Sequence, residues 1–257
     1  MMLEPTYPST ALPYSATGIL RVTVAGFLLL LVWDFSSLDL ILARWFGSPA
    51  GFPLQHHWFW EGVLHRGVKQ IQWLPALLLI AMVVWPVGVM RRLGYGQRLQ
   101  LAGGTLLALA LISGMKLLSL TSCPWDLHEF GGLALHVSHW LWGTADGGGG
   151  RCFPAGHASA GFAYVGGYFV FRRVAPRVAR LWLAAALLGG LALAVAQQVR
   201  GAHFMSHSLW TAWLCWLLAA LIDAGLNHLN RLPRQKRAPA PARENGFGAP
   251  VPATPPA

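Results

Sequence analysis

Residues 99–120 read LQLAGGTLLALALISGMKLLSL, and this stretch decides the fold class of the chain. Its side chains are almost all apolar, and Lys116 is the one charged residue in it. A transmembrane helix needs about 20 consecutive, predominantly apolar residues. The stretch is therefore predicted to be a helix that crosses a membrane.

The composition of the whole chain agrees with this prediction. Of its 257 residues, 55% are hydrophobic and only 11% are charged, whereas soluble domains carry about 25% charged residues. No period-2 alternation runs through the apolar segments, so helices are predicted rather than strands. We expect an all-α, polytopic integral membrane bundle of six transmembrane helices over residues 1–230. The six predicted spans are 18–33, 71–90, 99–120, 157–171, 179–199 and 209–226.

The positive charge of the chain indicates its topology. The net charge is +10, from 19 Lys and Arg against 9 Asp and Glu. In membrane proteins, loops rich in Lys and Arg lie on the cytoplasmic side. The basic residues follow the second, fourth and sixth predicted spans: Arg91, Arg92, Arg98, Arg172, Arg173, Arg177, Arg180, Arg231, Arg234, Lys236, Arg237 and Arg243. We therefore expect both termini in the cytoplasm, the other loops outside, and no nucleic-acid partner.

Two segments outside the spans have a marked composition. The tail at 231–257 is rich in Pro, Ala and Arg, and such a composition cannot bury a core, so a disordered, basic cytoplasmic tail is predicted. The segment 35–69 is rich in Trp and Phe and is predicted to lie at the membrane interface. There it either guides a lipid or serves as an aromatic belt.

Two sequence elements at the outward ends of spans carry candidate phosphate-binding groups. Lys116 ends the third span, where it either extends to the interface or binds an anion. In GRCFPAGHASAG, Pro154 begins a helix and leaves the amides near Gly156 uncovered, which favours an anion. His157 lies in the first turn, where it could pass a proton to a phosphate oxygen. The alternative is an ordinary helix start with a surface histidine.

A third element, AQQVRGAHFMSH, precedes the last span. Arg200, His203 and His207 are spaced by three and four residues, so a helix beginning here would place all three on one face. Arginine binds phosphate oxygens through a fork of donors, and a neutral imidazole can attack phosphorus. Interfacial histidines without a catalytic role are the alternative.

Together the three elements supply Lys, Arg and His without a metal-binding motif or paired carboxylates. This set favours phosphoryl transfer that needs neither metal nor cofactor, with cations holding the phosphate, one histidine attacking and another protonating the leaving oxygen.

The order of these motifs resembles the type-2 phosphatidic acid phosphatase and vanadium haloperoxidase superfamily, whose signature is K-x6-R-P, then P-S-G-H, then S-R-x5-H-x3-D. Here Lys116 is followed after six residues by Cys-Pro at 123–124, residues 154–157 read PAGH, and residues 201–207 read GAHFMSH. The six-span topology also resembles the membrane members of that superfamily. The resemblance covers the chain from about the second span to the sixth.

The third motif can be aligned in two ways. Aligning G-A-H-F makes His203 the nucleophile, with His207 at the family's Asp position and Gln197 at its Arg position. Aligning on Arg200 makes His207 the nucleophile, with Thr211 at the Asp position. We favour His203 because its stretch matches without a gap, and we expect His207 to orient the His203 ring as a carboxylate otherwise would.

Two further departures concern the first and second motifs. Cys123 replaces the family's Arg, and Ala155 replaces its Ser. Arg151, just before the second motif, could supply the missing guanidinium. Cys123 and Cys152 flank the two motifs in the same outward loop system, so a disulfide between them is expected in an oxidising compartment, with two free thiols as the alternative.

The resemblance implies hydrolysis of a phosphomonoester or pyrophosphate on a lipid headgroup at the outer leaflet. His203 would attack phosphorus, His157 would protonate the leaving oxygen, and Lys116, Arg200 and Arg151 would hold the phosphate together with the amides at Gly156. The expected location is a bacterial inner membrane with the site facing the periplasm. The alternatives are a lipid phosphotransferase with the same site, or a non-catalytic membrane protein that retains the scaffold.

Overall fold

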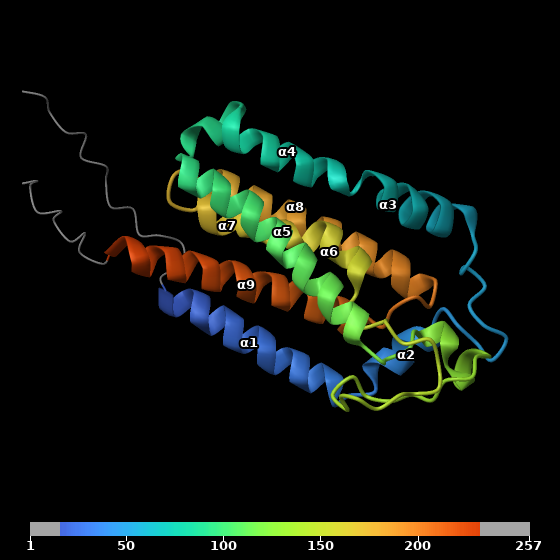
Figure 1. The fold of residues 1–257 in the computed structure, drawn as a ribbon. Helices are drawn as coiled ribbons and strands as arrows, with labels where there is room; N and C mark the ends of the chain where they lie inside the picture. Colours follow the sequence, from blue (N-terminus) through green and yellow to red (C-terminus); the bar gives the residue numbers. More distant parts are fainter. Residues whose placement is uncertain (1–15, 232–257) are drawn as a thin grey trace, which may run out of the picture.

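The computed structural model describes residues 16–231, which form a bundle of helices with a cap of loops at one end (Figure 1). Within that range there are two isolated β-bridges and no strand. The helices are α1 (Ala16–Asp34), α2 (Leu38–Arg44), η1 (Trp58–Gly67), α3 (Val68–Ile71), α4 (Trp73–Val84), η2 (Gly88–Arg92), α5 (Tyr95–Leu118), η3 (Pro124–Asp126), η4 (His128–Phe130), α6 (Gly156–Phe162), η5 (Ala163–Val165), α7 (Gly166–Phe171), α8 (Pro176–Val199) and α9 (Met205–Arg231). The tail predicted to be disordered lies, from residue 232, outside the described residues.

Five helical segments of the described chain are long and apolar enough to cross a membrane. They are Ala16–Asp34, Trp58–Arg92, Tyr95–Leu118, Pro176–Val199 and Met205–Asn230. The predicted span at 157–171 is the exception, because it consists of the short, consecutive helices α6, η5 and α7. The all-helical membrane architecture is thus present, whereas the count of six spans is not confirmed.

The α6–η5–α7 segment lies inside the bundle rather than on its surface. Tyr168, Phe169 and Phe171 are almost fully buried in the main apolar core, and the backbone at Gly161 approaches Gly190 of α8 so closely that a Cβ atom would overlap it. Small residues permit this kind of close helix contact. The glycines that make the segment a weak helix also allow it to occupy the centre of the bundle.

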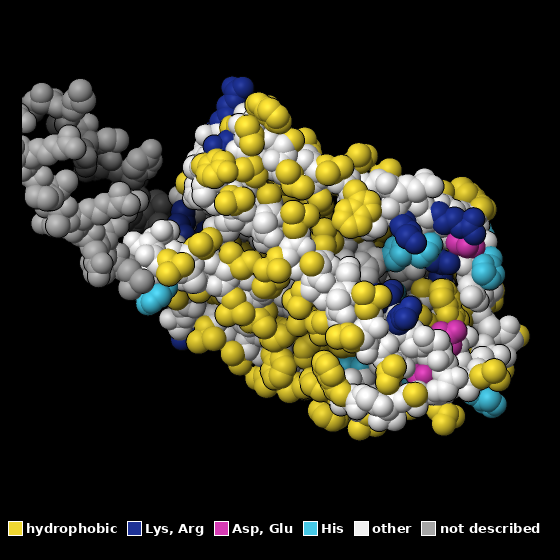
Figure 2. Space-filling view, in the orientation of Figure 1, with side chains coloured by type: hydrophobic (Ala, Val, Ile, Leu, Met, Phe, Trp, Pro, Cys, Tyr) yellow, Lys and Arg dark blue, Asp and Glu magenta, His cyan; other side chains and the backbone are white. Residues whose placement is uncertain are grey.

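The two ends of the bundle differ in charge. At one end, here called the basic end, lie the α4–α5 and α7–α8 junctions with Arg91, Arg92, Arg172 and Arg173, where Arg172 pairs with Asp223 at 2.7 Å. At the other, the loop end, residues 35–57 and 119–155 form the cap (Figure 1). Figure 2 shows apolar side chains over the flanks and a group of Lys, Arg and His side chains near the loop end. Apolar flanks between polar ends fit an integral membrane protein.

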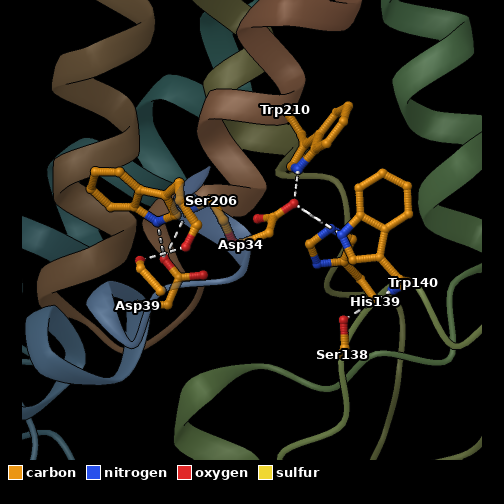
Figure 3. A network of polar contacts seen from close by, with 9 residues as sticks. Asp34, Asp39, Ser138, His139, Trp140, Ser206 and Trp210 are labelled. Atoms are coloured by element: carbon orange, nitrogen blue, oxygen red, sulfur yellow. Dashed lines mark hydrogen bonds and ion pairs between the residues drawn. The ribbon is translucent and has the colours of Figure 1, made fainter. Parts of the chain in front are cut away.

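A partly buried acidic network fastens the start of α9 to the loop end (Figure 3). Asp34 accepts hydrogen bonds from the indole nitrogens of Trp140 at 3.0 Å and Trp210 at 2.8 Å. Asp39 accepts a bond of 3.0 Å from the backbone N–H of Ser206. These carboxylates are therefore structural anchors, since each satisfies donors from α9 or the cap.

Candidate active site

The first and second sequence motifs meet at a polar cavity near the loop end. Lys116 lies in the last turn of α5, and Gly156 begins α6 directly beside it, so that a Cβ atom at position 156 would lie 3.6 Å from the Lys116 ammonium nitrogen. The cavity has a volume of about 240 Å³, and its lining includes both residues and His157. Figure 2 shows the Lys, Arg and His side chains that gather on this part of the surface.

The α6 start is fixed to α9 through its backbone. The N–H of Ala155 donates to the carbonyl of His207 at 3.1 Å, and the Thr211 hydroxyl lies within hydrogen-bond distance of the carbonyls of Ala155 and His207. These bonds hold the second motif against the third. They also show that Thr211 contacts backbone carbonyls, not the His207 ring.

His157 faces the cavity and stacks on a second histidine. The rings of His157 and His65 have centroids 4.1 Å apart and an interplanar angle of 23°. The buried Nε2 of His157 and the buried Nδ1 of His65 lack a hydrogen-bond partner among the described residues. Buried polar atoms without partners are costly, so this pair is a place where a polar ligand would be favourable.

His203 lies in the turn between α8 and α9, after Gly201, whose φ of +72° suits glycine. Its Nδ1 lies 2.8 Å from the carbonyl oxygen of Cys152. A carbonyl only accepts, so Nδ1 carries the proton and Nε2 keeps its lone pair. Burial lowers the pKa of His203 well below its ordinary value, and the nearby charge of Lys116 lowers it further. The ring is therefore neutral at pH 7.

The group that orients His203 is not the one expected from sequence. His207 lies in the first turn of α9, and its ring centroid is 6.0 Å from that of His203. The hydrogen bond to Nδ1 of His203 comes instead from the Cys152 backbone carbonyl. Because this acceptor belongs to the main chain, the expectation that His207 takes the carboxylate's place is wrong for that contact.

Arg200 is buried and held from two sides. Its Nε donates to the carbonyl of Gln55 at 2.9 Å, and its Nη1 donates to the side-chain oxygen of Gln197 at 3.1 Å. Burial lowers its pKa from the ordinary value. Because α8 ends at Val199 and α9 begins at Met205, Arg200 and His203 lie in a turn, and the expectation of one helical face for Arg200, His203 and His207 is wrong.

Arg151 lies away from the cavity lining. It is exposed, has a φ of +58°, and its backbone N–H donates to the carbonyl of Ser119 at 2.7 Å. It is not one of the residues that line the polar cavity. The structure therefore does not bring Arg151 to the position expected of a phosphate clamp.

Cys123 and Cys152 are joined by a disulfide, with their Cα atoms 5.2 Å apart. The bond ties the first motif to the second and fixes the residue whose carbonyl contacts His203. Atoms of Cys152, His203 and His207 lie within 4.8 Å of one another. The bonded sulfur is no thiolate, so only two nitrogen ligands remain, fewer than zinc sites use.

Comparison with known proteins gives the family. The model of the PAP2 superfamily matches residues 97–228, which is just over half of the chain and includes Lys116, His157, His203 and His207. The chain belongs to the PAP2 superfamily. No curated protein and no solved structure matches it.

PAP2 proteins are generally phosphatases, so the membership supports a phosphoric ester hydrolase. The matched region holds the three motifs in the order expected from sequence.

The sequence did not predict the part of the cavity that is formed by residues 65–72, outside the PAP2 match. Lys69 and Gln72 line the same cavity as Lys116, and His65 stacks on His157. The segment 35–69, which the sequence predicts to lie at the membrane interface, is helical from Trp58 onward and reaches the site. The sequence did carry a signal for this part of the cavity. His65 and Lys69 are four residues apart and Lys69 and Gln72 are three apart, and such spacings place side chains on one helical face.

Proposed function

We propose that this protein is a metal-independent membrane phosphatase that hydrolyses a phosphomonoester or pyrophosphate on a lipid headgroup through a phosphohistidine at His203. The observation that carries the proposal is the hydrogen bond from His203 Nδ1 to the Cys152 carbonyl. It leaves Nε2 unprotonated in a neutral ring, which is the form of imidazole that attacks phosphorus.

The chemistry proceeds in two displacements. In the first, Nε2 of His203 forms a bond to phosphorus, and the bond from phosphorus to the lipid oxygen breaks with its electron pair on that oxygen. Burial lowers the pKa of His157 to about 3, so in this proposal the ring takes up its proton with the substrate, whose negative phosphate favours the protonated form, and then gives that proton to the leaving oxygen. In the second, neutral His157 takes a proton from water, which attacks phosphorus and releases His203 and inorganic phosphate.

The cations of the site support the same chemistry. A transferring phosphoryl group spreads negative charge over its oxygens and needs preorganised positive charge near them. Lys116 lines the cavity beside Gly156, and Arg200 is held in the α8–α9 turn by Gln55 and Gln197. In this proposal Lys116 and the amides at Gly156 hold the phosphate, and Arg200 adds positive charge from its anchored position.

A second cavity supports a lipid substrate. An apolar cavity of about 520 Å³ lies between α4, α6 and α8, and its lining shares Ala160 with the polar cavity. A headgroup at His157 would thus have an apolar channel beside it for its chain. The flanks of the bundle expose apolar side chains such as Leu181, which is 72% exposed. Both observations favour a substrate that reaches the site from within a bilayer.

Sidedness is part of the proposal. The arginines at the α4–α5 and α7–α8 junctions lie at the basic end, opposite the site. By the positive-inside rule the basic end is cytoplasmic. In a bacterial inner membrane the site would face the periplasm, where an oxidising environment suits the disulfide between Cys123 and Cys152.

Phosphate release by the purified protein tests this function. The assay contains a metal chelator and offers phosphatidic acid, phosphatidylglycerol phosphate, polyprenyl pyrophosphate and lipid A. We expect at least one to be hydrolysed, His203→Ala to abolish both turnover and an acid-labile phosphoenzyme, and His207→Ala to leave slow turnover. The reverse pattern of the two variants would make His207 the nucleophile.

Two other outcomes separate the rival functions. Transfer of phosphate to a second lipid, without free phosphate, would identify a phosphotransferase that uses the same phosphohistidine. An absence of both reactions across the panel would favour a non-catalytic protein that retains the scaffold.

A further inference from the structure

The polar cavity lacks the guanidinium that the first motif of the superfamily provides. Cys123, at that position, is bonded to Cys152, and Arg151 does not line the cavity. Lys116 therefore remains the one cation that the first two motifs bring to the cavity. Phosphoryl transfer needs several cations around the phosphate. Arg200 of the third motif does not line this cavity, so a second cation inside it comes from outside the three motifs.

Lys69 lies where a second cation is needed. It lines the same cavity as Lys116 and His157, and it comes from the segment between η1 and α4, outside the region matched to the superfamily. Gln72 lines the cavity three residues later. A lysine within a candidate membrane-spanning segment is costly and calls for a reason.

The charges around Lys69 are unbalanced in the absence of a ligand. Lys69, which is exposed, and Lys116 line the same cavity, and no residue that lines the cavity is acidic. The nearby acid Glu61 is already paired with Arg66 at 2.6 Å and His56 at 3.1 Å. Two like charges that line one cavity without a carboxylate repel each other, so an anion bound between them would be favourable.

The helix that directly precedes the α3 turn with Lys69 is also unusual. η1 is a ten-residue π-helix, and π-helical segments are rare and frequently found at functional sites. It places His65 on the ring of His157, four residues before Lys69. η1 and the α3 turn that directly follows it thus bring His65 to the proton-transferring histidine and Lys69 to the cavity.

We propose that Lys69 binds the phosphate of the substrate, together with Lys116, in place of the arginine that is absent at position 123. The inference rests on the proposed phosphatase function, but it also predicts anion binding that can be measured without turnover. Lys69 acts as a point charge rather than a fork, so it neutralises the phosphate without fixing two of its oxygens.

The test compares Lys69→Met and Lys69→Arg with Arg66→Gln, a matched control that removes an exposed cation of the same segment outside the cavity. Two quantities are measured in detergent: kcat/KM for phosphate release from the lipid that the wild type turns over, and the rise in Tm caused by orthovanadate or inorganic phosphate. Lys69→Met should lower kcat/KM by about 100- to 1000-fold and abolish most of the anion-induced rise in Tm. Its Tm without anion should equal or exceed the wild-type value, because a like-charge repulsion is removed.

Lys69→Arg and Arg66→Gln distinguish a loss of the charge at position 69 from a general loss of positive charge. Lys69→Arg should recover part of both quantities, and Arg66→Gln should stay within about twofold of the wild type, since single surface changes alter stability little. Wild-type kcat/KM and anion stabilisation in Lys69→Met would overturn the proposal. If the wild type hydrolyses no lipid, the proposed function fails, and the anion-induced Tm of Lys69→Met against the wild type still decides whether Lys69 binds phosphate.

Discussion

Only Nε2 of His203 keeps a free lone pair, because Nδ1 carries the proton that it donates in a hydrogen bond to the Cys152 carbonyl. The motif spacing in the sequence favoured His203 over His207 as the nucleophile and indicated His157 and Lys116 as further candidates. It could not indicate the orienting group, because a backbone carbonyl carries no sequence signal. Nor could it indicate Lys69, since that residue reaches the cavity through the packing of the α3–α4 segment against α5 and α6.

Gly156 gives a prediction at the scale of one residue. A methyl group there would lie 3.5 Å from Cδ and 3.6 Å from Nζ of Lys116, which is ordinary contact but occupies space that a phosphate would use. Gly156→Ala should therefore leave stability within about 1 kcal/mol of the wild type and lower kcat/KM by roughly 10- to 100-fold. Gly114→Ala, in α5 where an added methyl meets no atom within 4 Å, should not alter turnover. Equal activity of the two variants would argue against a phosphate at Gly156.

At the scale of elements, the site is assembled from helix ends. α5 ends at Lys116, α6 starts at Gly156, and the α8–α9 turn supplies His203. The apolar runs in the sequence predicted most of these helices, because length and composition are enough to define a span. The α6–α7 segment differed from its prediction as a single span, because its glycines allow close packing inside the bundle.

Removal of the disulfide between Cys123 and Cys152 should lower both stability and turnover. Cys123 and Cys152 are 29 residues apart, so losing the bond should lower the free energy of unfolding by roughly 3 to 4 kcal/mol in the chain-entropy model. The double variant Cys123→Ser, Cys152→Ser should also lose turnover, because the Cys152 carbonyl would no longer be tethered beside His203. Thermal unfolding and phosphate release without reductant check both effects, with Cys215→Ala as the control that keeps the bond. Free alkylation of both thiols in protein from an oxidising compartment would contradict the linkage.

At the scale of the whole molecule, the arginine-rich junctions and the candidate site lie at opposite ends of the bundle. The arginine-rich junctions occupy the basic end, and the histidines and lysines of the site lie near the loop end, with apolar flanks between them (Figure 2). The charge pattern in the sequence predicted this polarity without any structure, because loop charges and span order together define which ends lie on one side. The reach of α3 and α4 into the site was not predictable in that way, since it depends on packing between distant segments.

This polarity gives a topology that can be measured. Single cysteines replacing Arg92 and Arg177, both exposed at the basic end, and Trp142, which is 77% exposed in the loop end, are offered a membrane-impermeant maleimide in intact cells and then in opened cells. Trp142→Cys should be labelled from outside, whereas Arg92→Cys and Arg177→Cys should be labelled only after opening, because arginine-rich loops stay in the cytoplasm. The wild type controls for background, since its one free thiol, Cys215, is buried. Labelling of Arg92→Cys or Arg177→Cys in intact cells would show that the bundle has the opposite orientation, with the phosphate site on the cytoplasmic side. The disulfide between Cys123 and Cys152 would not be expected to persist there.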